Sequence, residues 1–240
     1  MEWIKFDSAD DLAEKAFALV KQTIKKPNAV IALPTGYSPV PLYQKIVSEV
    51  NKGTISFRNV IAFTLDEYVG ISKDDPASFY NFIKTNLFNH IDIPPEHIHT
   101  PNGNADDLVS ECRRYDDLID RYGPINLAIL GVGKNGHIAF NEPGDDWDQK
   151  THIVTLSTST RKANAKYFIG REVPTKAITM GIRTILSAEK ILLLVVGRKR
   201  RAVKALMSGK INPKWPVTSL RLHDDVTVIV DKELYECTKS

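Results

Sequence analysis

Short runs of apolar residues alternate with longer amphipathic segments along this chain. The runs predict strands at 30–33, 60–65, 126–130, 191–196 and 226–230. Because each run is continuously apolar rather than alternating, we expect these strands to be buried on both faces of a sheet. The segments between them predict helices. The pattern therefore indicates a doubly wound, mostly parallel α/β sheet flanked by helices, of Rossmann-like type.

Helix-start signals mark the segments between the strands. Ser8 is placed to cap a helix that ends before Pro27, so helical residues are expected to begin close to Met1. Pro39 suits the first position of the next helix. Further helices are predicted at about 78–88, 107–122, 159–168 and 179–186.

Length and composition predict one domain over residues 1–240. Hydrophobic residues make up 42% of the 240 residues and charged residues 25%, which suits one sizeable core. The polar stretch 145–178 joins two core segments, and we expect it to form a helical lid that is mobile.

The charge balance and the cysteines exclude several classes of partner. With 32 basic and 29 acidic residues the net charge is +3, which gives no case for a nucleic-acid or membrane surface. The longest strongly apolar run, 191–196, is far below the roughly 20 residues that span a bilayer. Cys112 and Cys237 lie far apart and predict free thiols. Without a signal-peptide pattern at the start, the expectation is a cytoplasmic protein, with a homo-oligomer left open.

The loop after the first strand is a candidate phosphate site. In doubly wound sheets, ligands bind at the carboxyl ends of the strands. Here Thr35, Gly36, Tyr37 and Ser38 lead into a helix, and a helix start attracts phosphate through its unpaired N–H groups. The alternative is an ordinary turn capped by Ser38.

Two neighbouring carboxylates, Asp66 and Glu67, follow the second strand. Carboxylates at a buried strand end are costly unless they are paired or functional. Asp66 could take a proton from a ligand held by the first loop, whereas helix capping or a solvated turn is the alternative.

The loop after the third strand reads G-V-G-K-N-G-H-I-A-F-N-E-P-G over 131–144. It contains GxGxxG, but no amphipathic helix follows and Pro143 interrupts the segment, so it does not predict a dinucleotide site. His137 can transfer protons near neutral pH, and Glu142 can orient its ring. The loop therefore predicts catalysis.

No cofactor or metal is predicted, because His90, His97 and His99 lack a second group of ligands.

Three motifs resemble the glucosamine-6-phosphate deaminase (isomerase) family: L-P-T-G-Y-S-P at 33–39, L-D-E-Y-V-G at 65–70, and the stretch 131–144. Supporting stretches keep the family order over nearly the whole chain, at 101–107, 111–115, 179–182 and 222–226. The resemblance implies a cofactor-free aldose–ketose isomerisation with deamination. Glucosamine 6-phosphate is opened, a proton moves from C2 to C1, and fructose 6-phosphate and ammonia are released.

The resemblance also implies roles for particular residues. Asp66 falls on the general base for C2 and His137 on the residue that assists ring opening, with Asn135 and Glu142 as its supporters. Asn135 stands where some members have aspartate.

The phosphate site implied by the resemblance is Thr35, Gly36, Tyr37 and Ser38, together with Lys166 and Arg200. Tyr37 stands where many members have glycine, so its ring must point away from the phosphate. Lys166 replaces an arginine. Lys199 and Arg201 remain alternatives to Arg200, because the segment from 197 to 209 is one residue short.

Several alternatives stay open at this point. The epimer galactosamine 6-phosphate could be the substrate, the chain could be a 6-phosphogluconolactonase-like enzyme or another sugar-phosphate isomerase, or it could be a non-catalytic sugar-phosphate sensor. Some family members are activated by an N-acetylated sugar phosphate that basic residues hold. Here the matching segment, 151–154, reads T-H-I-V, so no such activation is expected.

Overall fold

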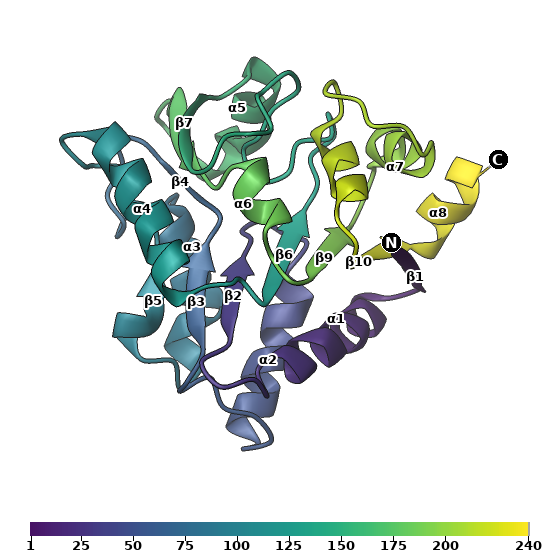
Figure 1. The fold of residues 1–240 in the computed structure, drawn as a ribbon, viewed down its shortest axis with the longest axis horizontal. Coiled ribbons are helices and arrows are strands. Elements are labelled where there is room, and N and C mark those ends of the chain that lie inside the picture. Colours follow the sequence, from purple (N-terminus) through teal and green to yellow (C-terminus); the bar gives the residue numbers. More distant parts are fainter. Residues whose placement is uncertain (240) are drawn as a thin grey trace.

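The computed structural model describes residues 1–239. Its main sheet has seven strands in the order β1-β10-β9-β6-β2-β3-β5, and all neighbouring strands run parallel (Figure 1). The strands are β1 (Glu2–Phe6), β2 (Val30–Leu33), β3 (Ile61–Thr64), β5 (Ile98–His99), β6 (Leu127–Gly131), β9 (Ile191–Val195) and β10 (Val226–Asp231). The predicted parallel sheet is thus confirmed.

Helices cover both faces of this sheet. One face packs against α1 (Ala9–Thr23), α2 (Val40–Asn51) and α3 (Phe79–Asn86). The other packs against α4 (Leu108–Tyr122), α6 (Ile182–Leu186), α7 (Arg200–Met207), α8 (Lys232–Lys239) and the 3₁₀ helix η4 (Pro216–Leu222). Successive residues of a strand point to opposite faces, so Ile31 joins the first cluster and Ala32 the second. Short 3₁₀ helices η1 (Phe88–His90) and η2 (Pro95–His97) precede β5.

A second, antiparallel sheet lies beyond the carboxyl ends of the main strands. It consists of β4 (Asp66–Tyr68), β8 (Lys176–Thr179) and β7 (His152–Thr155), in that order. With α5 (Thr158–Asn164) and the 3₁₀ helix η3 (Ala165–Tyr167) it lies at the upper left of Figure 1, whereas α7 lies at the upper right. The expected lid at 145–178 is therefore helical only in its middle, because strands β7 and β8 flank that part.

Three expectations about element boundaries need correction. Residues 2–6 are a strand that pairs with β10, so the chain does not begin with helical residues. The helix expected at 179–186 starts only at Ile182, because Thr179 completes β8. Pro39 is the N-cap of α2 and not its first helical residue. By contrast, Ser8 caps α1 as predicted, since its hydroxyl accepts the N–H of Asp11 at 3.1 Å.

The connections between strands reverse direction at one position in the sheet. β2 and β6 are neighbours, yet the chain continues from β2 to β3 on one side and from β6 to β9 on the other. The loops that follow β2 and β6 therefore separate at the carboxyl edge, and such a switch point is where doubly wound sheets bind ligands.

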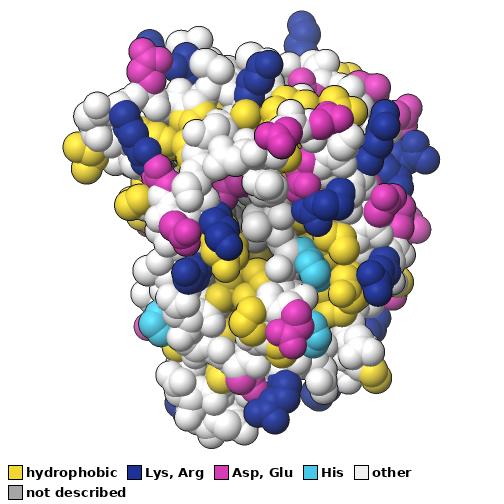
Figure 2. Space-filling view, turned by 90° about the vertical axis from the view of Figure 1, so that its left-hand side faces the viewer, with side chains coloured by type: hydrophobic (Ala, Val, Ile, Leu, Met, Phe, Trp, Pro, Cys, Tyr) yellow, Lys and Arg dark blue, Asp and Glu magenta, His cyan; other side chains and the backbone are white. Residues whose placement is uncertain are grey.

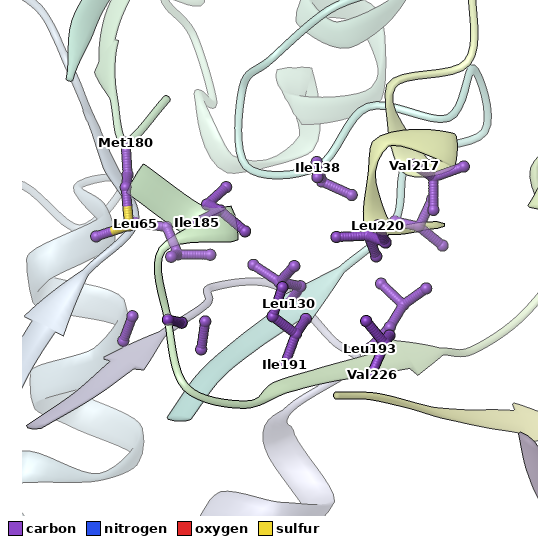
Figure 3. Close-up of a cluster of buried hydrophobic side chains, with 14 of the residues drawn as sticks. Leu65, Leu130, Ile138, Met180, Ile185, Ile191, Leu193, Val217, Leu220 and Val226 are labelled. Carbon is purple, nitrogen blue, oxygen red and sulfur yellow. The ribbon is translucent and has the colours of Figure 1, made fainter. Parts of the chain in front are cut away.

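The loop after β6 is fixed to the hydrophobic core beneath it. Ile138 is fully buried and packs in the same cluster as Leu130, Val217 and Leu220 (Figure 3). Burying such a side chain stabilises the fold by about 1.5–3 kcal/mol. Ile138 thereby fixes the position of its neighbour in the chain, His137.

Acidic and basic side chains are interspersed on the face drawn in Figure 2, and no large patch of one sign forms there. Within residues 1–239, no helix combines the length and the apolar character needed to cross a membrane.

Candidate active site

A cavity of about 210 Å³ lies at the switch point. Its walls come from the loops after β2, β3 and β6, from the start of α3, and from Asn164 and Tyr167 beside the small sheet. Six of the residues predicted from the sequence line it: Thr35, Gly36, Tyr37, Ser38, Asp66 and His137. The fold therefore brings the three candidate loops together around one space.

The loop after β2 turns sharply into α2. Gly36 has a φ of +86°, a conformation that glycine adopts without strain. Ser38 is not the cap of this helix: the N-cap is Pro39, and α2 has no side-chain cap hydrogen bond within the part of the chain that the structure describes. The first-turn N–H groups of a helix that lacks a side-chain cap are suited to bind an anion.

Lys166 does not line the cavity, but it contacts two tyrosines that do, Tyr37 and Tyr167. Its Nζ lies 4.1 Å from the ring centroid of Tyr37 and 4.8 Å from that of Tyr167. The Tyr37 side chain is 66% exposed, so its ring lies outward and against the ammonium. Cation–π contacts of this kind hold a lysine loosely, by about 0.5–1 kcal/mol at an exposed site.

Among the three basic candidates after β9, Lys199 and Arg200 differ in environment. Lys199 is half-buried at the N-cap of α7, and burial together with the neighbouring charge of Lys134 lowers its pKa. Its charge also contributes to lowering the pKa of His137. Arg200 and Arg201 are exposed in the first turn of α7, and none of the three candidates lines the cavity. Lys199 is thus the cation nearer to the site.

Asp66 is the first residue of β4 and is only 6% exposed. Its Oδ1 atom is buried and has no hydrogen-bond partner among residues 1–239. Burial, with a smaller contribution from the negative charge of Glu67, raises the pKa of Asp66 to about 8. A carboxyl group without a partner and with a raised pKa, facing a cavity, is typical of a group that exchanges protons with a ligand.

Glu67 has a structural role, as the capping alternative anticipated for this pair. Its carboxylate accepts the Ser78 hydroxyl at 2.7 Å and the backbone N–H groups of Tyr68, Phe79 and Tyr80 at 2.9 to 3.1 Å. Burial raises its pKa against the opposing effect of these bonds. Glu67 thereby fixes the start of α3 against β4 and leaves Asp66 free of that task.

We expect Glu67→Gln to lower the free energy of unfolding by about 2 kcal/mol or more. The amide can accept with one atom only, and its NH₂ group then faces N–H or hydroxyl donors that lose their acceptor. Urea unfolding of the variant and the wild type measures the difference. A change below about 0.5 kcal/mol, the usual range of surface substitutions, would contradict this role.

His137 is held in a tight turn of the loop after β6. A Cβ atom on Gly133 would lie 2.2 Å from the imidazole Cε1, so only glycine leaves room for the ring. Gly136 has a φ of +85° and accepts the N–H of Val217 through its carbonyl at 2.8 Å. Burial lowers the pKa of His137, and the neighbouring Glu142 partly opposes this. The imidazole is therefore kept neutral at physiological pH.

Asn135 and Glu142 stand behind His137. The Asn135 Nδ2 atom donates to Glu142 Oε2 at 2.6 Å, and its Oδ1 accepts the backbone N–H of His137 at 3.3 Å. Glu142 Oε1 lies 3.9 Å from His137 Nδ1. The expected grouping of these three residues is present, with the carboxylate 6% exposed.

Two hydroxyl residues in this region were not predicted from the sequence. Ser157 and Thr160, at the start of α5, both donate to Glu142 Oε1. The S-T-S-T stretch signals a helix start, but no local pattern connects it to a carboxylate in another loop. Within residues 1–239, His, Cys, Asp and Glu side chains do not gather in groups of three that could hold a metal ion.

The fold and the site define a class of sugar-phosphate enzymes. Residues 5–229 match the family of glucosamine-6-phosphate isomerases and 6-phosphogluconolactonases, and the chain belongs to this family. The resemblance of the three motifs is thereby confirmed.

Within this family, the chain is similar to proteins named glucosamine-6-phosphate deaminase. The glucosamine-6-phosphate deaminase of Thermoanaerobacter sp. (strain X514) is 48% identical over 227 residues, which cover 93% of this chain and 90% of the relative. Glucosamine-6-phosphate deaminase 1 of Bacillus subtilis (strain 168) is 45% identical over 236 residues, covering 97% and 98%.

Solved structures superpose on this chain over nearly its whole length. A monomeric glucosamine-6-phosphate deaminase superposes with a TM-score of 0.94 at 43% identity, covering 98% of this chain and 99% of that one. The 6-phosphogluconolactonase of Thermotoga maritima superposes with a TM-score of 0.77 at 20% identity, covering 96% and 99%, and shows a shared fold.

Proposed function

We propose that this protein is an enzyme that converts glucosamine 6-phosphate into fructose 6-phosphate and ammonia. The observation that carries the proposal is Asp66, a buried carboxyl group without a partner in the described residues, which faces the same cavity as His137 and the loop before α2. The relatives at 43–48% identity that are named glucosamine-6-phosphate deaminase support the same reaction.

Each step of this reaction has a candidate group. Neutral His137 would pass a proton between the ring oxygen and solvent and so open the pyranose. Asn135, itself bonded to Glu142, would hold the His137 backbone in place. Asp66 holds a proton below about pH 8, so turnover would depend on its ionised form, which would remove the C2 proton and transfer it to C1. The carbon–nitrogen double bond formed at C2 is hydrolysed by water, which leaves the ketone and ammonia.

The phosphate would bind at the start of α2 and between basic side chains. Thr35, Gly36, Tyr37 and Ser38 supply backbone N–H and hydroxyl groups, and Lys166 would leave the two tyrosine rings to reach the phosphate. Lys199 would complete the site, because a phosphate relieves the repulsion between Lys199 and Lys134.

We expect Lys199→Gln to raise KM for the sugar phosphate about 10- to 100-fold, the value of one hydrogen bond to a charged group. Arg200→Gln is the matched control, since the two side chains are adjacent and carry the same charge. Comparison of KM for the two variants in steady-state kinetics shows which of the two residues contacts the phosphate. A larger effect of Arg200→Gln would establish Arg200 as the phosphate contact.

The segment 145–178 is proposed as the lid of this site, with α5 and η3 as its moving part. It carries Lys166, and Asn164 and Tyr167 line the cavity. Closure over the substrate would exclude water. Hydrogen exchange at 158–167 should slow when a sugar-phosphate analogue binds, and equal exchange with and without the analogue would argue against a lid.

The experiment that tests the function follows ammonia and fructose 6-phosphate together after addition of glucosamine 6-phosphate. Equal release of both products supports the deaminase. Release from galactosamine 6-phosphate alone would keep the mechanism and change the substrate. Hydrolysis of 6-phosphogluconolactone without ammonia release would identify a lactonase, and heat stabilisation by the sugars without turnover would identify a sensor.

A further inference from the structure

The Glu142 carboxylate joins the catalytic loop to the start of α5. Its Oε2 accepts the Asn135 amide at 2.6 Å. Its Oε1 accepts the Thr160 hydroxyl and, at 3.2 Å, the Ser157 hydroxyl. Thr160 is 4% exposed, so water does not replace its hydroxyl. One carboxylate is thus held from both sides.

Glu142 Oε1, which accepts the two hydroxyl groups, is also the carboxylate oxygen that lies near His137 Nδ1. The distance of 3.9 Å from His137 Nδ1 to Glu142 Oε1 is too long for a hydrogen bond. Nδ1 is buried and has no partner in the part of the chain that the structure describes. Buried ring nitrogens normally have one, because leaving such a group unpaired costs about 1–3 kcal/mol. The hydroxyl groups on Oε1 therefore stand where the histidine would otherwise bond.

We propose that Thr160, assisted by Ser157, is a positioning residue that competes with His137 Nδ1 for Glu142 Oε1 and so limits the interaction within this acid–base pair. The catalytic consequence of this inference rests on the proposed function, whereas the hydrogen-bond geometry does not depend on it. Since Thr160 belongs to the segment that carries Lys166, the proposal also connects the position of α5 to the protonation of His137.

The other charged groups around His137 and Glu142 stay the same when Thr160 is changed. Lys199, with Lys134 behind it, faces His137, and Asp66 lies on the wall of the same cavity. Asp145 faces Glu142, and its carboxylate accepts the Glu142 backbone N–H at 2.7 Å. A change in the titration of His137 in a Thr160 variant therefore reports on the hydroxyl itself.

The test is an NMR titration of histidine-labelled protein without substrate, with the His137 signal assigned by a His137→Gln variant. Thr160→Val removes the hydroxyl at nearly constant volume and frees Oε1 for His137. A carboxylate in direct contact raises the pKa of a histidine by about one unit or more. We expect that rise in Thr160→Val and a pKa close to the wild-type value in Thr160→Ser.

Matched variants separate this role from a structural one. Thr158→Val makes the same change on an exposed position of α5 and should leave the His137 titration unchanged. Ser157→Ala removes the second hydroxyl that donates to Glu142 Oε1 and should raise the pKa of His137 by a smaller amount. This variant allows the test to be made if Thr160→Val does not fold. A His137 pKa that is the same in wild type, Thr160→Val and Ser157→Ala overturns the proposal.

Activity supplies a second readout. If His137 must be neutral, kcat/KM of Thr160→Val falls about tenfold on the acid side of the profile and recovers at higher pH, because one unit of pKa is a factor of ten in the neutral fraction. A structural defect would lower activity equally at every pH and overturn the proposal. The titration needs no substrate, so failure of the deaminase assay leaves its result intact.

Discussion

Replacement of Asp66 by asparagine is expected to lower kcat for the release of fructose 6-phosphate and ammonia by about 10²- to 10⁴-fold, the usual contribution of a positioned acid–base group. Asparagine keeps the size of the side chain but cannot accept the C2 proton. KM should change little, because Asp66 is proposed to act on the reacting carbon and not on the phosphate. Both products should fall in parallel when followed in one assay.

The adjacent carboxylate gives the control for this result. Glu67→Gln is the same kind of change one residue along the chain, and it affects the start of α3 without removing the proposed base. We expect the two variants to show opposite effects: loss of turnover without loss of stability for Asp66→Asn, and loss of stability with retained turnover for Glu67→Gln. Retained release of both products in Asp66→Asn would contradict the role of Asp66 as the base at C2.

The stability of the wild-type protein is expected to fall, relative to Asp66→Asn, as the pH rises from about 4 to 8. Asp66 has a pKa of about 8 in the folded protein, whereas an unfolded aspartate titrates near 3.9. Between these values the folded state binds a proton that the unfolded state has released, so stability decreases with pH. Over about four units the loss is on the order of 5 kcal/mol, and it is complete above pH 8.

Denaturant unfolding of both proteins at a series of pH values measures this difference. Asp66→Asn carries no titrating group at this position, and all other ionisable groups are shared, so the subtraction isolates Asp66. The two proteins should be equally stable near pH 4, and the variant should be the more stable one at pH 9. A difference that does not depend on pH would show that Asp66 is ionised in the folded protein throughout.

The elements with the clearest local pattern were predicted best. The continuously apolar runs at 30–33, 191–196 and 226–230 correspond to β2, β9 and β10, because strands covered on both faces have no polar side to display. The three loops that line the cavity were also predicted, since a parallel sheet brings the carboxyl ends of its strands to one edge.

The elements that depend on a distant partner were missed. β1 is an edge strand paired with β10 at the other end of the chain, and the three strands of the small sheet have three or four residues each. None of these segments is a continuously apolar run like that of β2, and their formation depends on the strand beside them.

The α/β class, the family and the residues that could take part in proton transfer could all be predicted from the chain alone, because burial pattern and residue chemistry are properties of local segments. The division of roles among these residues depended on how the chain folds. The fold assigned Glu67 to the start of α3 and left Asp66 unpaired at the cavity, and it brought Thr160 onto Glu142. It also placed Lys199, half-buried, where its charge acts on His137, and left Arg200 exposed. Desolvation and hydrogen bonding depend on neighbours in space, and the sequence states only neighbours in the chain.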